Sequence, residues 1–174
     1  MLLIKNGHIK TMAGTEYENG YVLINDEGKI AEVGASYAGG EVETVIDAEG
    51  RLVTPGCVEA HCHTGLSGYA MDWAGKDINE SSEPITPQMR AIDGFNPMDE
   101  SLSIRGGVTT ACTGPGSANI IGGTFAAVKL AGKRVDKMIV KYPLAMKCAF
   151  GENPKRNYGK ERKKSPVTRM GTAA

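Results

Sequence analysis

The chain has 174 residues, about the length of one domain. Hydrophobic residues make up 41% and charged residues 23%, an ordinary globular composition that argues against intrinsic disorder. Lysine plus arginine and aspartate plus glutamate both number 20, so the overall charge does not favour a nucleic-acid partner. The balance is uneven, however, because residues 154–170 hold seven basic residues and one glutamate. We expect this stretch of net charge +6 to be solvated surface; binding of phosphate or nucleic acid is the alternative.

The chain carries no sign of a membrane or an oxidising compartment. No apolar run approaches the roughly 18 residues of a membrane span, and the opening Met1-Leu2-Leu3-Ile4 meets Lys5 too early for a signal peptide. The four cysteines include no Cys-x-x-Cys pair, which argues against a cysteine zinc site and a disulfide framework. We therefore expect a cytoplasmic protein with reduced thiols and no membrane partner.

Residues 1–54 show the alternation typical of short strands. The predicted strands cover residues 2–5, 8–12, 21–24, 30–33, 42–46 and 51–53. A turn at residues 25–28 predicts a β-hairpin between the third and fourth of these strands. The region is therefore expected to be a small layer of about six strands, one part of a composite β-sandwich that needs a covering layer.

From residue 55 the pattern changes to alternating strands and helices. Strands are predicted at residues 53–63, 107–112 and 137–142, and helices at residues 98–105 and 124–130. Strand, helix, strand, helix, strand is the order of a βαβ system with a parallel sheet, as in an α/β barrel. We expect residues 55–174 to form the first part of a TIM-like barrel.

The length of this second region does not suffice for a closed barrel. Eight βα units take about 250 residues, whereas residues 55–174 supply 120, enough for three or four units. The last residues, 165–170, resemble the start of a helix that does not continue. The sequence therefore predicts a truncated polypeptide.

The sharpest chemical feature is the pair His61 and His63 near the end of a predicted strand. Residues i and i+2 of a strand project from the same face, so the two imidazoles lie side by side while Cys62 points the other way. Two adjacent imidazoles are typical metal ligands and suit Zn, Fe, Ni or Mn. Two hydrogen-bonded surface histidines are the alternative. His8, the third histidine of the chain, has no partner of this kind and is assigned no role.

Three further features allow two interpretations each. Glu59 shares the face of His61 and either orients an imidazole from the second shell or is a buried partner. The glycine-rich segment 114–117, with Gly122-Gly123, forms a structural turn or offers amides to an anionic substrate. Trp73 lies in an acidic stretch, where it is a packing anchor or lines a pocket.

The segment Pro55-Gly56-Cys57-Val58-Glu59-Ala60-His61-Cys62-His63-Thr64-Gly65 resembles the first barrel strand of the amidohydrolase superfamily, which has a Pro-Gly start and a His-x-His end after a small β layer. Residues 106–110 and 146–156 are similar to its imidazolonepropionase-related members. The resemblance implies that His61 and His63 bind one or two divalent metals. It also implies a bridging ligand, for which Glu152 is the candidate and Lys147 the alternative, with a solvated Glu152 as a third possibility. The family's later histidines and late aspartate have no counterpart here, since no histidine follows His63.

These observations predict the amino-terminal part of a metal-dependent amidohydrolase that hydrolyses a C–N bond of a cyclic amide or amidine-like small molecule. The expected cofactor is a divalent metal, zinc first, with Fe, Mn or Ni as alternatives. A non-catalytic subunit or fragment with residual metal binding is the alternative function. The chain alone is expected to be inactive, and to form a homo-oligomer or associate with the missing carboxyl-terminal half. A nucleic-acid-binding module rests only on the basic stretch.

Overall fold

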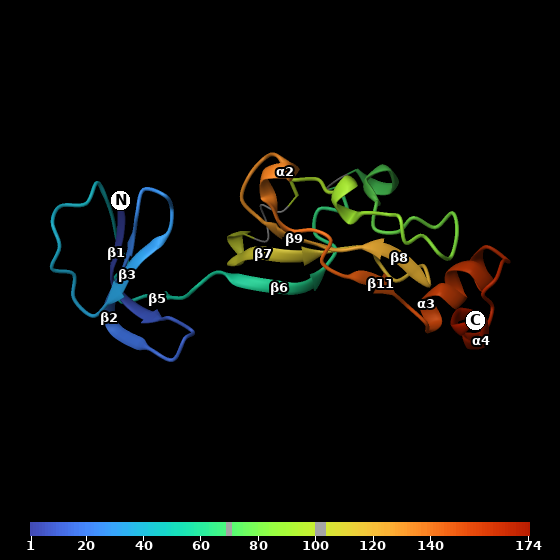
Figure 1. The fold of residues 1–174 in the computed structure, drawn as a ribbon, viewed down its shortest axis with the longest axis horizontal. Coiled ribbons are helices and arrows are strands. Elements are labelled where there is room, and N and C mark those ends of the chain that lie inside the picture. The colour runs from blue at the N-terminus through green and yellow to red at the C-terminus, as the bar shows by residue number, and fades with distance from the viewer. Residues whose placement is uncertain (69–70, 100–103) are drawn as a thin grey trace. The chain divides into compact units, whose positions relative to one another are not determined.

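The structure is a computed structural model that describes residues 1–68, 71–99 and 104–174. The chain divides into two compact units, Met1–Pro55 and Gly56–Ala174 (Figure 1). The first is a β-sheet, and the second combines strands, short helices and long connecting segments. Each unit is described by itself below.

The first unit is one sheet in the order β3-β2-β1-β4, with β5 also paired to β1. Its strands are β1 (Leu2–Lys10), β2 (Glu16–Ile24), β3 (Ile30–Gly34), β4 (Thr44–Asp47) and β5 (Leu52–Val53). β1 is antiparallel to β2 and parallel to both β4 and β5. The β layer predicted from the alternating sequence pattern is confirmed as this sheet.

The hairpin predicted between residues 21 and 33 is confirmed as β2 and β3. The Asn25 side chain builds the turn, because its Oδ1 accepts hydrogen bonds from the amides of Glu27 at 3.1 Å and Lys29 at 2.8 Å. Gly28 completes the turn at a φ of 72°, which is unfavourable for residues with a Cβ. Local turn chemistry therefore sets the register of this pair.

The two strands predicted at residues 2–5 and 8–12 are wrong as separate elements, since they form the single strand β1. An irregularity between Ile4 and Gly7 bends the strand, and Asn6 there has a φ of 55°. A Cβ on Gly7 would lie 2.8 Å from Val53 Cγ2, so the glycine allows β5 to approach. The sheet thus has five strands rather than about six.

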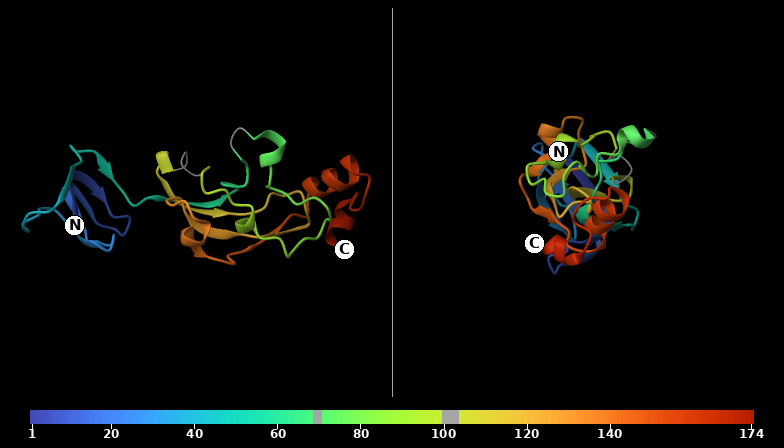
Figure 2. Two further views of the ribbon diagram at one scale, coloured as in Figure 1. Left: turned by 90° about the horizontal axis from the view of Figure 1, so that it is seen from above. Right: turned by 90° about the vertical axis from the view of Figure 1, so that its right-hand side faces the viewer.

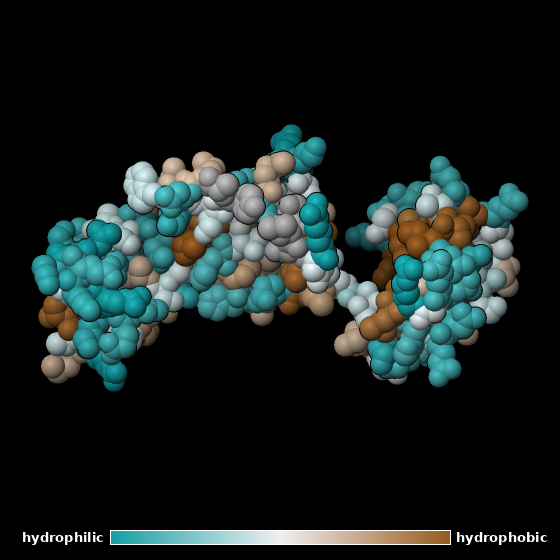
Figure 3. Space-filling view, turned by 180° about the vertical axis from the view of Figure 1, so that it is seen from behind, coloured by the Kyte–Doolittle hydropathy of each residue, from teal (hydrophilic) through white to brown (hydrophobic). Residues whose placement is uncertain are grey.

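The small core of the first unit is formed by Leu3, Ile9, Tyr21, Val22 and Ala48. Other apolar side chains stay exposed, among them Ile30 at 66% and Leu52 at 60%. Figure 3 shows apolar side chains gathered on the surface of this unit, and a groove of about 240 Å³ is lined largely by apolar residues of β1, β2 and β3. The sheet has more apolar surface than its own residues cover.

The second unit contains a four-stranded sheet in the order β10-β9-β7-β6 and a two-stranded sheet of β11 and β8. The strands are β6 (Cys57–Cys62), β7 (Val108–Thr113), β8 (Ile121–Thr124), β9 (Ala126–Lys129), β10 (Ile139–Lys141) and β11 (Met146–Cys148). The helical segments are η1 (Asp72–Gly75), η2 (Ala91–Asp93), α2 (Val135–Met138), α3 (Glu152–Lys155), η3 (Arg156–Glu161) and α4 (Arg169–Ala173). The described fold is therefore mixed α/β, with several sheets and few helices.

The helix predicted at residues 124–130 is wrong, because this segment forms the end of β8 and then β9. β9 pairs antiparallel with both β7 and β10, whereas β6 and β7 are parallel. The run is too short for a stable helix between Gly123 and Gly132, and its apolar residues are buried within a sheet that has two paired neighbours. The predicted strand-helix-strand order is therefore replaced here by an antiparallel arrangement.

The core of the second unit lies on the β7 and β9 strands. It consists of Ile92, Phe95, Ala111, Ala126, Val128, Leu130 and Met138. Ala126, Val128 and Leu130 have no exposed surface. In Figure 1 the α2 segment covers the β7 and β9 strands, and it contributes Met138 to this core. The core is thus completed by Ile92 and Phe95, which precede β7 in the chain, and by Met138, which follows β9.

The remaining helix predictions have different outcomes. The helix predicted at residues 98–105 falls largely on residues 100–103, which lie outside the described residues. Residues 165–170, which resemble the start of a helix that does not continue, lead into α4 (Arg169–Ala173). There Thr168 Oγ1 accepts from the Gly171 amide at 3.0 Å. Among the described residues, no helix combines the length and the apolar character that a membrane span requires.

Candidate metal centre

His61 and His63 come together at the carboxyl end of β6. Their ring centroids lie 5.7 Å apart with the planes at 87°. The neighbouring end of β7 fixes this chain segment, because the Gly114 amide donates to Cys62 O at 3.2 Å and Thr113 Oγ1 donates to Thr64 O at 2.7 Å. The i and i+2 spacing on an extended chain therefore brings the two imidazoles close, as the period of a strand requires.

The hydrogen bond of His63 defines which nitrogen is free. Its Nδ1 lies 2.7 Å from the carbonyl oxygen of Gly114. A carbonyl oxygen can only accept, so Nδ1 carries the proton and donates it. The neutral ring then keeps an unprotonated Nε2, the state in which an imidazole binds a metal, with the carbonyl holding its orientation.

Lys147 of β11 is the third group at this position. Its Nζ lies 3.2 Å from Nε2 of His61, across a separation of 86 residues in the chain. The Lys147 side chain is only 9% exposed, although lysine is rarely buried. Because an ammonium group only donates, Nε2 of a neutral His61 accepts this hydrogen bond.

Phe125 forms an apolar wall against this pair. Its ring centroid lies 5.4 Å from that of His61, at 75°, and 5.9 Å from Lys147 Nζ. A Cβ on Gly114 would overlap the Phe125 ring at 2.2 Å, so Gly114 leaves the space that the ring occupies. Sequence reasoning missed Phe125 because it assigned the segment to a helix; the nearby glycines were the available signal.

Glu59 and Glu152 have contacts of another kind. Glu59 is exposed, so its interpretation as a buried partner is wrong, and its Oε1 accepts from the backbone amide of His61 at 2.9 Å. Glu152, on α3, accepts from Arg169 Nη2 at 3.0 Å and from Lys155 Nζ at 3.4 Å. The hydrogen bond from Arg169 and the charge of Lys155 hold the pKa of the Glu152 carboxyl below its usual value.

The structure therefore joins His61, His63 and Lys147, and shows Glu152 among basic side chains of α3 and α4. In Figures 1 and 2 these two helices lie beyond the ends of β8 and β11. Within residues 1–68, 71–99 and 104–174, no three side chains of His, Cys, Asp or Glu gather into a group that could hold a metal ion. The roles predicted for Glu59 and Glu152 stay predictions.

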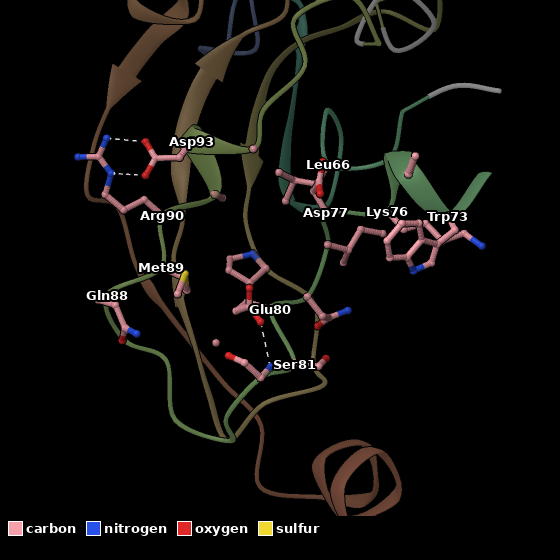
Figure 4. A pocket seen from close by; sticks show the side chains of 18 of the residues that line it. Leu66, Trp73, Lys76, Asp77, Glu80, Ser81, Gln88, Met89, Arg90 and Asp93 are labelled. Atoms are coloured by element: carbon pink, nitrogen blue, oxygen red, sulfur yellow. Dashed lines mark hydrogen bonds and ion pairs between the residues drawn. The ribbon is translucent and has the colours of Figure 1, made fainter. Parts of the chain in front are cut away.

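The second unit also contains a cavity of about 690 Å³, and no residue of the candidate metal centre is among its lining residues (Figure 4). Gly122 of β8 and Pro115 line it, and a Cβ on Gly122 would lie 3.5 Å from Lys147 Cγ. β8 pairs with β11 on one side and is bridged to residues 85 and 90, from the cavity-lining loop, on the other. The same strand therefore positions Lys147 and one wall of the cavity.

The structure decides between the two interpretations of Trp73 and between those of the glycine-rich segment 114–117. Trp73 lines the cavity and is 83% exposed, so the packing-anchor interpretation is wrong. In the glycine-rich segment, the amides of Gly114 and Gly116 donate to the carbonyls of Cys62 and Ile78. Those amides are engaged in backbone pairing, as a structural turn requires.

Known proteins resemble this chain in sequence and in fold. No family model matches the chain. It is 40% identical over 168 residues to the amidohydrolase tasK of Hapsidospora irregularis, an alignment covering 87% of this chain and 17% of that protein. It is 43% identical over 98 residues to a 5'-deoxyadenosine deaminase of Methanococcoides burtonii, covering 53% of this chain and 22% of the relative.

The fold matches an amidohydrolase from Thermotoga maritima with a TM-score of 0.91 and 40% identity, covering 99% of this chain and 45% of that one. The chain belongs to the amidohydrolase superfamily, and it corresponds to a partial, amino-terminal region of these longer proteins. It spans less than half the length of each relative described here.

Proposed function

We propose that this chain is the amino-terminal part of a metal-dependent amidohydrolase that hydrolyses a C–N bond, with a metal centre at His61 and His63. The observation that carries the proposal is the 2.7 Å contact between His63 Nδ1 and Gly114 O, in which Nδ1 must be the donor because the carbonyl can only accept. In the neutral ring Nε2 is then unprotonated, and a second imidazole lies with its centroid 5.7 Å away. The relatives named amidohydrolase and deaminase support C–N chemistry.

The donors present fit a divalent metal. Two neutral imidazoles suit zinc, iron, manganese or nickel, and zinc is the expected ion. When bound, the metal would supply Lewis-acid polarisation and activation of water. His63 would hold the metal through Nε2, and His61 through the Nε2 that accepts from Lys147 in this structure. Lys147 is the neighbouring basic group. It is a better candidate for the third group of the centre than Glu152, which is engaged in ion pairs with Lys155 and Arg169.

Substrate and partners follow from the same proposal. A small molecule with an amidine-like C–N bond agrees with the relative named as a deaminase, and a cyclic amide is the alternative. We propose further that β6 and β7, the parallel pair, are the first strands of a barrel completed by additional chain. β6 is an edge strand with most of its residues exposed, and such an edge accepts another strand. A soluble, cytoplasmic protein fits this proposal.

A non-catalytic subunit or fragment with residual metal binding is the second candidate. It is favoured by one observation, that the described residues offer no further cluster of His, Cys, Asp or Glu beside the histidine pair. Catalytic zinc sites usually have three protein ligands, so two imidazoles alone would bind zinc weakly. The two candidates differ in whether turnover appears when the rest of the longer protein is supplied.

Zinc titration by calorimetry tests the proposal. The chain should bind zinc reversibly at about pH 7.5 and more weakly at about pH 5.5, because an imidazole must be neutral to act as a ligand. His61→Ala or His63→Ala should each abolish binding, whereas His8→Ala in the first unit is the matched control and should leave it unchanged. Parent-like binding by both site variants would overturn the metal centre.

Two further variants identify the third group. Lys147→Met should change zinc affinity and Glu152→Gln should not, if the arrangement around His61 persists with metal bound. The reverse result would make Glu152 the bridging ligand. The chain alone should show no turnover of cyclic amides or amidines, and robust hydrolysis by it would contradict the partial-protein interpretation.

A further inference from the structure

The helical segments that follow β11 form a second, smaller pocket. α3 runs directly into η3, and a pocket of about 470 Å³ lies against them. This volume is in the range of small-molecule sites. The lining residues are Glu152, Lys155, Arg156, Gly159, Lys160 and Val167. None of them lines the larger cavity or belongs to the histidine pair, so the pocket is a separate feature of the second unit.

The charge of this α3–η3 pocket is positive. Three basic residues and one acidic residue line it, which gives a net charge of +2. The acidic residue, Glu152, is shared between Lys155 Nζ at 3.4 Å and Arg169 Nη2 at 3.0 Å. The ionic partners outside the lining, Arg169 and Glu161, have opposite charges and leave this sum unchanged. Lys160 has no acidic partner among the described residues, and a concave wall of one sign concentrates its field.

The wide turn of η3 brings two like charges into the same pocket. η3 is a π-helix, a rare form that joins residues five apart across one turn and is frequent at functional sites. Arg156 and Glu161 have this spacing and form an ion pair of 3.7 Å. Lys155 and Lys160 have the same spacing and both line the pocket, but their charges repel. An anion bound between the two ammonium groups removes this repulsion, so the arrangement points to a negatively charged ligand.

Buried groups hold the backbone of the pocket in place. Tyr158 of η3 is fully buried, and its hydroxyl lies 2.6 Å from Glu83 O and 2.8 Å from Asn119 Oδ1. On the pocket side, a Cβ on Gly159 would lie 2.8 Å from Val167 Cγ1, so the glycine lets the returning chain form a wall. The π-turn is thus fixed to distant segments of the unit, and the pocket is organised before any ligand binds.

Phosphate is the anion that this lining fits best. The Arg156 guanidinium pairs with Glu161 through Nε, and its other N–H groups suit the oxygens of a phosphate. Lys155 and Lys160 supply point charges from the neighbouring turn. A phosphate group offers three oxygens and up to two negative charges, whereas a carboxylate has two oxygens and one charge. The lining contains no aromatic side chain on which a base could stack, which favours a small molecule over single-stranded nucleic acid.

We propose that the α3–η3 pocket binds the phosphate group of a small molecule, with Lys155, Arg156 and Lys160 as its recognition residues. The two lysines hold the group from successive turns, and the guanidinium donates to its oxygens. Glu152 stays in its ion pairs and keeps the Lys155 ammonium beside the pocket. No recognition residue contacts the histidine pair, so binding does not require the metal centre.

Calorimetric titration of the whole chain with pyrophosphate tests the proposal. Pyrophosphate presents phosphate oxygens without any other group that the chain could recognise. The chain is first treated with a chelator, so that no metal ion binds the probe, and is kept at low ionic strength. Pyrophosphate should bind saturably at one site and more weakly as salt is added, because salt screens the charges. Acetate at the same concentrations should not bind.

Variants locate the interaction. Lys160→Gln should weaken pyrophosphate binding about fivefold, and the double variant Lys155→Gln/Lys160→Gln about twentyfold. Lys163→Gln, in the same basic segment but outside the lining, should change the affinity less than about twofold. Lys133→Gln, an exposed lysine elsewhere in the second unit, is the second control and should bind like the parent. His61→Ala should also bind like the parent.

Four results would overturn the proposal. The first two are the absence of saturable pyrophosphate binding and parent-like affinity in the double variant. Equal weakening by Lys160→Gln and Lys163→Gln would assign the interaction to the basic segment in general rather than to the pocket. Loss of binding in His61→Ala would place the anion at the histidine pair instead.

Discussion

The two units of this chain differ in how far apart in the sequence the residues that define their main features lie. In the first unit, an alternating pattern and one asparagine-built turn define the central hairpin, whose pairs join residues close in the chain. In the second unit, the candidate metal centre joins His61 to Lys147 across 86 residues, and the cavity wall is held by Asn119 and Tyr158. Local chemistry therefore suffices for a hairpin, whereas a site assembled from distant strands depends on the whole unit being folded.

The comparison predicts that a core substitution in the second unit has the largest effect on stability. Leu130 has no exposed surface, and Leu130→Ala should lower the free energy of unfolding of that unit by about 3 kcal/mol through lost burial and a cavity. Hydrogen exchange of peptides from β7 and β9 should report the loss, while peptides from β1 and β2 stay protected.

Leu52→Ala, at a side chain 60% exposed in the first unit, is the control and should change stability by less than about 0.5 kcal/mol. Equal loss of protection in both units after Leu130→Ala would show that they unfold together and would remove the distinction drawn above.

A turn substitution should have a smaller effect, confined to the first unit. Gly28 has a φ of 72°, and a Cβ added there would meet nothing within 4 Å, so the cost of Gly28→Ala is conformational, about 1 kcal/mol. Gly40→Ala meets open space as well but lacks the positive φ, and should be neutral or slightly stabilising. Urea unfolding of both variants measures the difference; equal values would contradict the role assigned to the turn.

The smallest effect should come from the exposed charges of α3 and α4. The Glu152 carboxyl has a pKa lowered first by its hydrogen bond from Arg169, then by Lys155. A depressed folded pKa contributes stability above the unfolded value of about 4.5, and this is lost as the pH falls through the folded pKa. Arg169→Ala should raise the Glu152 pKa, as measured by NMR of the carboxyl carbon, and added salt should reduce the difference.

Arg134→Ala is the matched control, since Arg134 pairs with Asp136 instead. It should leave the Glu152 titration unchanged. An unchanged titration in Arg169→Ala would show that this pair is not maintained in solution.

The outcome of the sequence predictions follows the same division. The β2–β3 hairpin was predictable because its turn and both strands lie within one short segment. The segment 124–130 was assigned to a helix because seven residues of mixed apolar character do not distinguish a helix from a buried strand. Pairing with β7 and β10 makes this segment a strand, and these pairs between distant residues exist only in the folded unit.

For the candidate site, the sequence by itself determined that His61 and His63 share a face, because the side-chain period of an extended chain is two. Only the tertiary structure decided which groups surround them. Lys147 was one of two candidates, and pairing of β11 with β8 brings it to 3.2 Å from His61, while Phe125 was not foreseen. Period and turn chemistry are local properties of the chain, whereas strand pairing between distant segments is chosen by the burial and hydrogen bonding of the entire unit.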